Sequence, residues 1–275
     1  MLAPPAPPAL RPWSFILLAF AFTWAFAGFF WLVDPMAAKG SPSTATMVTS
    51  YVAVWGPSLA GLVLAWRTGG REGAWRLLRR LWKWPGTLWL ALAAAIPLGA
   101  EFVGALIGWA IGPYSFEALS DVGPGRLLLF IATTLVSGPL GEELGWRGYG
   151  LERAAARYGP RVAAVLMAAA WSLWHLPAFL IPGLQQLIFP TGLSFLEFAS
   201  FTMSSGIMMA WLTFRAKGAL GPAVLFHLCL LMMLLAVSER PPATLVWPTS
   251  AVFAALALLV LIREPRLGYR AFDPD

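Results

Sequence analysis

The residues of this chain that could do chemistry lie inside its apolar stretches. Glu142, Glu143 and Arg147 fall in one stretch, and the two histidines of the chain, His175 and His227, fall in two later ones. Ionisable side chains are costly in apolar surroundings and mark functional sites when they occur there. One carboxylate and two imidazoles could together deprotonate a water molecule, hold a metal ion, or do both. Two histidines and a carboxylate are also the ligands of one class of catalytic zinc site.

The two adjacent glutamates are expected to play different roles because they point in different directions. Successive residues on a helix are rotated by about 100°, so Glu142 and Glu143 cannot share one partner. Glu143 and Arg147 are spaced i, i+4 with the acid first, which is the favourable order for an ion pair. The spacing therefore predicts that Glu143 is structural and that Glu142, on another face, is the chemical residue.

A segment expected to break the helix, Gly138-Pro139-Leu140-Gly141, stands immediately before the glutamates. Proline removes a helix hydrogen bond and clashes with the preceding turn. At membrane depth, such a break is tolerated only where it faces protein or a wet cavity. The segment predicts a water-accessible pocket beside Glu142. Glu101 has no visible partner and stays unassigned, whereas Glu197 begins an apolar run and is interpreted as interfacial.

The composition of the chain is that of a membrane protein. Hydrophobic residues make up 59% of it and charged residues 12%, whereas a soluble domain carries about 25% charged residues. The apolar residues form runs about 20 residues long, which is the length of a membrane-spanning helix. Strict alternation is absent, so the spans are expected to be helices rather than barrel strands. The sequence predicts an all-α, polytopic transmembrane helix bundle.

Eight apolar runs are visible, and the basic residues support that count. If the N-terminus is cytoplasmic and each run crosses once, all but Lys39, Arg126 and Arg240 of the 19 Lys and Arg residues fall on the cytoplasmic side. This split predicts both termini in the cytoplasm, in the inner (plasma) membrane. It also explains the net charge of +6 without a nucleic-acid partner. The runs are 14–33, 47–66, 87–112, 127–148, 162–181, 195–214, 219–237 and 244–262.

Three motifs resemble those of the CPBP family, the intramembrane endopeptidases that include CAAX proteases and bacteriocin-processing (Abi) proteins. GEELGWRGYGL resembles its E-E-x-x-x-R motif, WSLWHLP its motif of an aromatic residue before a histidine, and the later LFHLCLL the histidine of its H-x-x-x-N motif. The resemblance covers roughly residues 126–237. The matching residues are Glu142, Glu143 and Arg147, then Trp171 and His175, then His227.

The apolar runs and the resemblance together divide the chain into four expected parts. Residues 1–13 are expected to be a disordered cytoplasmic N-terminus, and 14–125 to be N-terminal transmembrane helices. Within the latter, 71–84 mixes basic and aromatic residues at helical spacing and predicts an amphipathic helix at the membrane surface. Residues 126–237 would form the CPBP-like peptidase core. Residues 238–275 would be the last span and a cytoplasmic tail.

The resemblance implies hydrolysis of a peptide bond within the membrane. Glu142 and His175 would activate water and His227 would help to stabilise the oxyanion, with Glu143 and Arg147 in support. The family has been described both as metal-dependent and as working without a directly bound metal. A divalent metal such as zinc, if present, would be held by Glu142, His175 and His227.

One position departs from the family pattern. Leu231 stands where the third motif has asparagine, and the chain contains no asparagine at all. Removing one oxyanion donor typically lowers turnover by about 10²–10³. The chain would then be slow, use another donor, or be non-catalytic. Hydroxyls of the sixth run, Thr202, Ser204 and Ser205, are candidate replacement donors.

Three functions therefore remain in view. The first is an endopeptidase acting on a peptide or protein substrate, lipidated or not, among membrane lipids. The second is a catalytically weakened relative that serves as a scaffold or self-immunity protein. The third is a proton-linked transporter, against which the missing inverted repeat counts. The lack of asparagine and the many Ala, Arg, Gly and Pro residues are typical of a GC-rich bacterial genome.

Overall fold

A computed structural model of the chain describes residues 12–34, 43–111, 123–180, 194–236 and 243–269. Over these residues the protein is helical and contains no β-strand. The elements are α1 (Pro12–Val33), α2 (Thr44–Val54), α3 (Gly56–Arg79), α4 (Thr87–Ile111), α5 (Pro124–Ser137), α6 (Pro139–Glu143), the π-helix η3 (Leu144–Gly150), α7 (Leu151–Tyr158), α8 (Pro160–Trp174), α9 (Leu176–Leu180), α11 (Phe195–Arg215), α12 (Gly221–Ala236) and α13 (Ala243–Arg263).

Each of the eight apolar runs corresponds to one helix or to consecutive helices, which confirms the polytopic all-α bundle. Six of these units are long and apolar enough to cross a membrane: α1, α4, α5 to α7, α8 with α9, α11, and most of α13. The pair α2 and α3 meets the same test as one span bent by 42°, and α12 is a shorter apolar helix. The exact number of spans stays a prediction.

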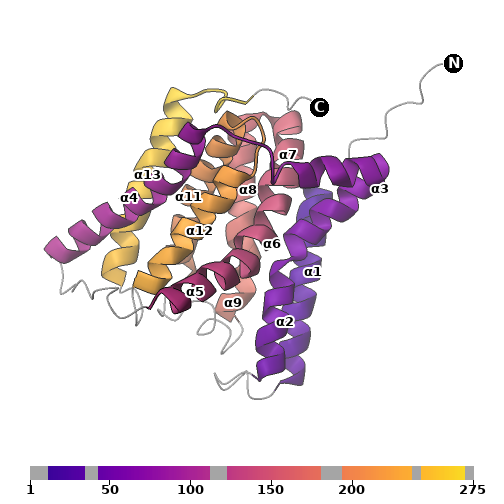
Figure 1. Ribbon diagram of the computed structural model, residues 1–275, viewed down its shortest axis with the longest axis horizontal. Coiled ribbons are helices and arrows are strands. Elements are labelled where there is room, and N and C mark those ends of the chain that lie inside the picture. Colours follow the sequence, from indigo (N-terminus) through magenta and orange to yellow (C-terminus); the bar gives the residue numbers. More distant parts are fainter. Residues whose placement is uncertain (1–11, 35–42, 112–122, 181–193, 237–242, 270–275) are drawn as a thin grey trace.

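The bundle packs around α11, which contacts both α8 and α13 (Figure 1). Helix α4 lies against α12 and α13, while α1 and α3 pack on each other and α3 also packs on η3. This last contact depends on Gly145, because a Cβ there would collide with the backbone carbonyl of Pro57. Small residues let membrane helices approach this closely. The π-helix is thus held between α3 and the rest of the bundle.

The fourth run is broken where the sequence predicts it. Helix α5 ends at Ser137, Gly138 adopts φ −143° and ψ −91°, and α6 starts at Pro139. From α3, Ser58 Oγ donates a hydrogen bond of 3.0 Å to the carbonyl oxygen of Leu140. The break therefore faces protein, as membrane depth requires. Two further breaks, at Trp55 and at His175, divide the second and fifth runs.

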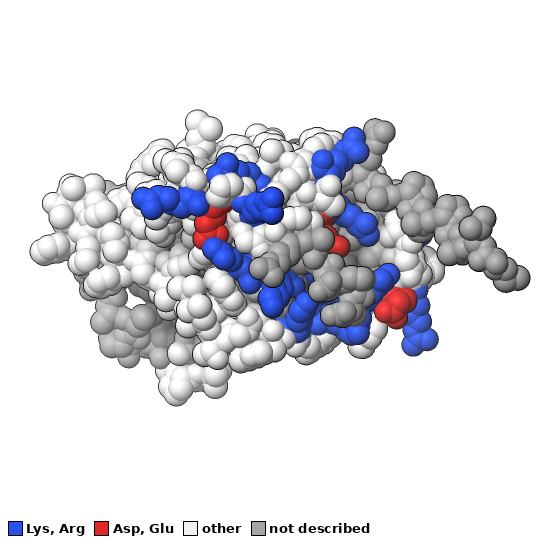
Figure 2. Space-filling view, turned by 90° about the horizontal axis from the view of Figure 1, so that it is seen from above, with Lys and Arg blue, Asp and Glu red and all other residues white. Residues whose placement is uncertain are grey.

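Lys and Arg side chains gather at one end of the bundle. Figure 2 shows them on the face at the top of Figure 1, where α7 and the end of α13 lie. This grouping agrees with the charge split, although it does not say which side of a membrane the face meets. The expected disordered segment 1–13 ends too late, because α1 begins at Pro12. Its remaining part, 1–11, and the C-terminal residues 270–275 lie outside the described residues.

The amphipathic segment 71–84 is helical over part of its length. Helix α3 bends at Gly70, whose φ is +60°, and then continues only to Arg79 rather than to residue 84. The helix ends there because Arg80 turns into the bundle, where its carbonyl oxygen accepts from the backbone N–H of Leu220 at 2.9 Å. Trp75, Trp82 and Trp84 are exposed, as an interfacial segment requires.

Candidate active site

A buried charge cluster centres on Glu143. Its Oε1 accepts from Arg147 Nη1 at 2.9 Å and from His227 Nδ1 at 2.8 Å. Glu143 is 0% exposed, Arg147 2% and His227 4%. The ion pair predicted from the i, i+4 spacing is therefore present, and His227 joins it from α12. Because a carboxylate only accepts, His227 Nδ1 must carry a proton. Nε2 is then the ring nitrogen that does not bond to Glu143.

Arg147 is held from several sides. Its guanidinium lies over the ring of Trp171, 4.4 Å from the ring centroid. On α11, a Cβ at Gly206 would come within 3.3 Å of Arg147 Nη2, so glycine makes room for the guanidinium. The backbone is fixed too, because Arg80 donates to the carbonyl oxygens of Gly148 at 2.6 Å and Arg147 at 3.4 Å. These contacts fix the π-helix that carries the arginine.

Glu142 points away from the ion pair, as the helical rotation predicts. Its Oε2 accepts a hydrogen bond of 2.5 Å from the indole Nε1–H of Trp171 on α8. Glu142 is 4% exposed, and His227 and Arg147 are near enough to attract it electrostatically. Two buried carboxylates thus face one guanidinium, so a doubly protonated His227 would make the cluster electrically neutral.

His175 caps the C-terminus of α8, at the break before α9. Its Nδ1 lies 2.8 Å from the carbonyl oxygen of Trp171. A carbonyl oxygen only accepts, so Nδ1 carries a proton and the neutral ring has its lone pair on Nε2. The half-buried ring packs against the rings of Trp174 and Phe198, with centroids 4.7 and 4.8 Å away.

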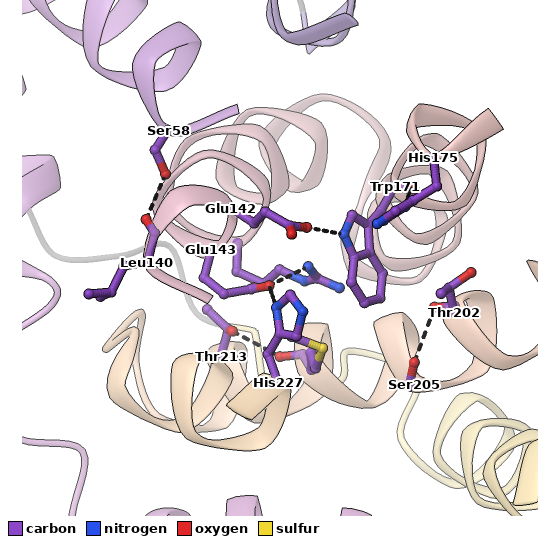
Figure 3. Close-up of polar contacts among 12 residues, drawn as sticks. Ser58, Leu140, Glu142, Glu143, Trp171, His175, Thr202, Ser205, Thr213 and His227 are labelled. Carbon is purple, nitrogen blue, oxygen red and sulfur yellow. Dashed lines mark hydrogen bonds and ion pairs between the residues drawn. The ribbon is translucent and has the colours of Figure 1, made fainter. Parts of the chain in front are cut away.

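The three predicted catalytic residues meet at Trp171 (Figure 3). Glu142 from α6 binds its N–H, while the rings of His227 and His175 lie edge-to-face with it at 5.3 and 5.7 Å. The aromatic residue of the second motif was expected, but its contacts with the other motifs were not. A polar partner for Trp171 could have been predicted, because a buried tryptophan N–H usually needs a hydrogen-bond partner.

The side chains do not form a metal-binding group. Across the described ranges, no three His, Cys, Asp or Glu side chains are grouped closely enough to hold a metal ion. His227 directs Nδ1 to Glu143, and Glu142 directs Oε2 to Trp171. These bonds do not use Nε2 of either histidine or Oε1 of Glu142, so a metal held by Glu142, His175 and His227 stays a prediction.

The position that departs from the family motif lies beside the cluster. Leu231 is half-buried, and its Cδ1 would lie 3.1 Å from a Cβ placed on Gly138; His227 Nε2 would lie 4.0 Å from the same point. Leucine offers no donor there. The hydroxyls considered as replacements donate to backbone carbonyls instead: Thr202 to Phe198, Ser204 to Ser200 and Ser205 to Phe201. A hydroxyl has one proton to donate, so any of these residues would have to give up its present bond to serve as an oxyanion donor, and that role stays a prediction.

The other two glutamates that the sequence analysis singled out, Glu197 and Glu101, take no part in the cluster. Glu197 forms a capping box with Ser194 at the start of α11, with Glu197 Oε2 accepting from the Ser194 backbone N–H at 2.6 Å. Glu101 lies on α4, which packs against α12 and α13. Its Oε1 is buried with no hydrogen-bond partner among the described residues.

Comparison with known proteins covers this same region. Residues 124–233 match the family model of type II CAAX prenyl endopeptidase Rce1-like proteins. All the site residues described above except Arg80 and Ser58 fall within it. Over this region the chain is similar to the CPBP (CAAX protease) family. A curated relative, CAAX prenyl protease 2 of Methanococcus maripaludis, is 28% identical over 181 residues, which cover 64% of this chain and 62% of the relative's length.

Proposed function

We propose that this chain is an intramembrane endopeptidase that hydrolyses a peptide bond with a water molecule activated by Glu142 and His175. The observation that carries the proposal is the meeting of the three motifs at Trp171. The similarity to known proteins supports the same reaction class, since the matched family model is described as a CAAX prenyl endopeptidase and the relative as a CAAX prenyl protease.

In the proposed reaction, the Glu142 carboxylate removes a proton from water while the water oxygen attacks the substrate carbonyl carbon. The carbonyl electron pair moves onto its oxygen to give a tetrahedral oxyanion. That pair then returns to re-form the C=O bond as the C–N bond breaks and the amine leaves. The amine takes up the proton that Glu142 received, so atoms and charge balance. His175 Nε2 accepts a hydrogen bond from the same water. A positioned general base of this kind contributes about 10²–10⁴ in rate.

His227 is proposed to stabilise the oxyanion. With Nδ1 donating to Glu143, a second proton on Nε2 would make the ring a donor toward the substrate oxygen. Glu143 fixes the direction of that ring, and Arg147 fixes Glu143. The supporting roles of Glu143 and Arg147 follow from these bonds, because donors must already be in place when charge develops.

We further propose that water is activated without a directly bound metal. The support is that no three His, Cys, Asp or Glu side chains among the described residues are grouped closely enough to hold a metal ion. Dialysis against a strong chelator should then leave hydrolysis within about twofold of the untreated rate. Loss of activity on chelation, restored by added zinc, would contradict this mechanism.

The proposed substrate is a peptide with a lipid-modified cysteine near its C-terminus. The support is the activity that gives the relative its name, CAAX prenyl protease 2, although the match covers only 62% of that relative's length. Purified protein in liposomes should cleave prenylated or acylated peptides of a panel faster than the matched unmodified ones, and equal or faster cleavage of the unmodified peptides would contradict this substrate. Glu142→Gln should lower cleavage by about 10²–10⁴, whereas Glu197→Gln, which keeps the cap of α11, should not change it.

A catalytically weakened scaffold is the second candidate, and Leu231 is the observation that favours it. Leucine cannot donate to an oxyanion, and the nearby hydroxyls donate to backbone carbonyls. A scaffold would show no cleavage of any panel peptide in the wild-type protein or in Leu231→Asn. Cleavage by either protein would decide against the scaffold.

A further inference from the structure

Trp171 connects all three proposed catalytic groups. Its N–H binds Glu142, its carbonyl oxygen binds His175, and its ring packs on His227. We propose that Trp171 is a positioning residue whose indole N–H holds the Glu142 carboxylate in its working orientation. The proposal rests on the endopeptidase function proposed above, and it assigns a role to a single N–H bond rather than to the aromatic ring.

The indole is itself fixed, so its N–H has a defined direction. Trp171 is 2% exposed. The Arg147 guanidinium covers one face at 4.4 Å, and the His227 ring meets it at an angle of 76°. A Trp side chain has only two rotatable bonds, and both are restricted by these neighbours. The donor is therefore in place before substrate arrives, which is what preorganisation of a catalytic group requires.

Without this donor, Glu142 has a competing partner. Arg147 attracts the Glu142 carboxylate electrostatically, and Arg147 Nη2 is buried without a hydrogen-bond partner among the residues described. A carboxylate bound to that guanidinium would be a weaker base, since its charge would be shared with a cation. The indole N–H occupies Oε2 and leaves Oε1 to meet the water molecule. The bond thus keeps Glu142 apart from the Glu143–Arg147 pair.

A conservative substitution can remove this bond without removing the ring. A phenyl ring is also aromatic, but it has no N–H to donate. Trp171→Phe therefore removes the hydrogen bond while keeping an aromatic ring against Arg147 and His227. This makes it a selective test of the N–H.

The experiment compares two Trp→Phe variants in the same liposome assay. Trp171→Phe should lower kcat roughly 10- to 100-fold with KM within about twofold, because a hydrogen bond to a charged group is among the stronger ones. Trp211→Phe is the matched control, since Trp211 Nε1 donates to another carboxylate, Glu264 Oε2, at 2.9 Å outside the cluster. It should leave both constants unchanged.

A double-mutant cycle separates positioning from general damage to the fold. Glu142→Asp withdraws the carboxylate by one methylene, so adding Trp171→Phe to it should change kcat less than about twofold. Additive effects, or full activity in Trp171→Phe, would overturn the proposal. The thermal midpoints of the same four proteins should show the same coupling. If the wild-type protein cleaves no peptide, the proposed endopeptidase function is refuted instead. If the two substitutions lower the thermal midpoint additively, the hydrogen bond between Trp171 and Glu142 is refuted.

Discussion

Removing the negative charge of Glu143 tests the structural part of the site without relying on activity. Glu143→Gln keeps an oxygen acceptor for Arg147 and His227 but takes away their counter-ion. Arg147 is only 2% exposed, so water cannot replace the lost charge. Removing one partner of a buried ion pair typically costs about 3–5 kcal/mol. The retained acceptor places the expected loss near the lower end, about 3 kcal/mol.

The assay is thermal unfolding of the purified protein in one detergent. A loss of about 3 kcal/mol should lower the melting temperature by roughly 6–12 °C in a protein of this size. Glu142→Gln, the same change at the adjacent residue, should lower it far less because Glu142 has no salt bridge to lose. Equal melting temperatures for Glu143→Gln and wild type, or a larger fall for Glu142→Gln, would refute the assigned roles.

Three further outcomes are expected. Leu231→Asn should raise turnover by about tenfold or more, because losing one oxyanion donor costs about 10²–10³; unchanged turnover in a folded variant would mean another donor acts. Partial burial raises the pKa of Glu264, but hydrogen bonds from Arg215 and Trp211 outweigh it and hold that pKa below its ordinary value. Glu264→Gln should therefore cost about 1 kcal/mol or less at pH 7, and the difference should vanish as pH falls through the lowered folded-state pKa; a difference that persists in acid would contradict this. A C-terminal reporter that works only in the cytoplasm should be active, whereas activity of a periplasmic reporter would contradict the eight-span topology.

Features that depend on local spacing were predictable from the sequence. The run lengths located the helices, Pro139 located the break after α5, and the i, i+4 spacing located the Glu143–Arg147 pair. Each depends on residues within a turn or two of each other. Helical geometry alone fixes such relations.

Contacts between distant helices were not predictable in the same way. The bonds from His227 to Glu143 and from Trp171 to Glu142 join residues 84 and 29 positions apart. Hydropathy places these residues at membrane depth but does not say which faces meet. The contact of Arg80 with the π-helix likewise depends on where α3 ends. A single sequence does not show which faces of distant helices contact each other.

The central claim is that Glu142 is the base of an endopeptidase. The most direct test is mass spectrometry of a prenylated CAAX-type peptide incubated with the protein in liposomes made with ¹⁸O-labelled water. Wild type should yield two products, with one ¹⁸O atom in the new carboxylate, and Glu142→Gln with an unchanged melting temperature should yield almost none. Cleavage by Glu142→Gln at the wild-type rate would contradict the account.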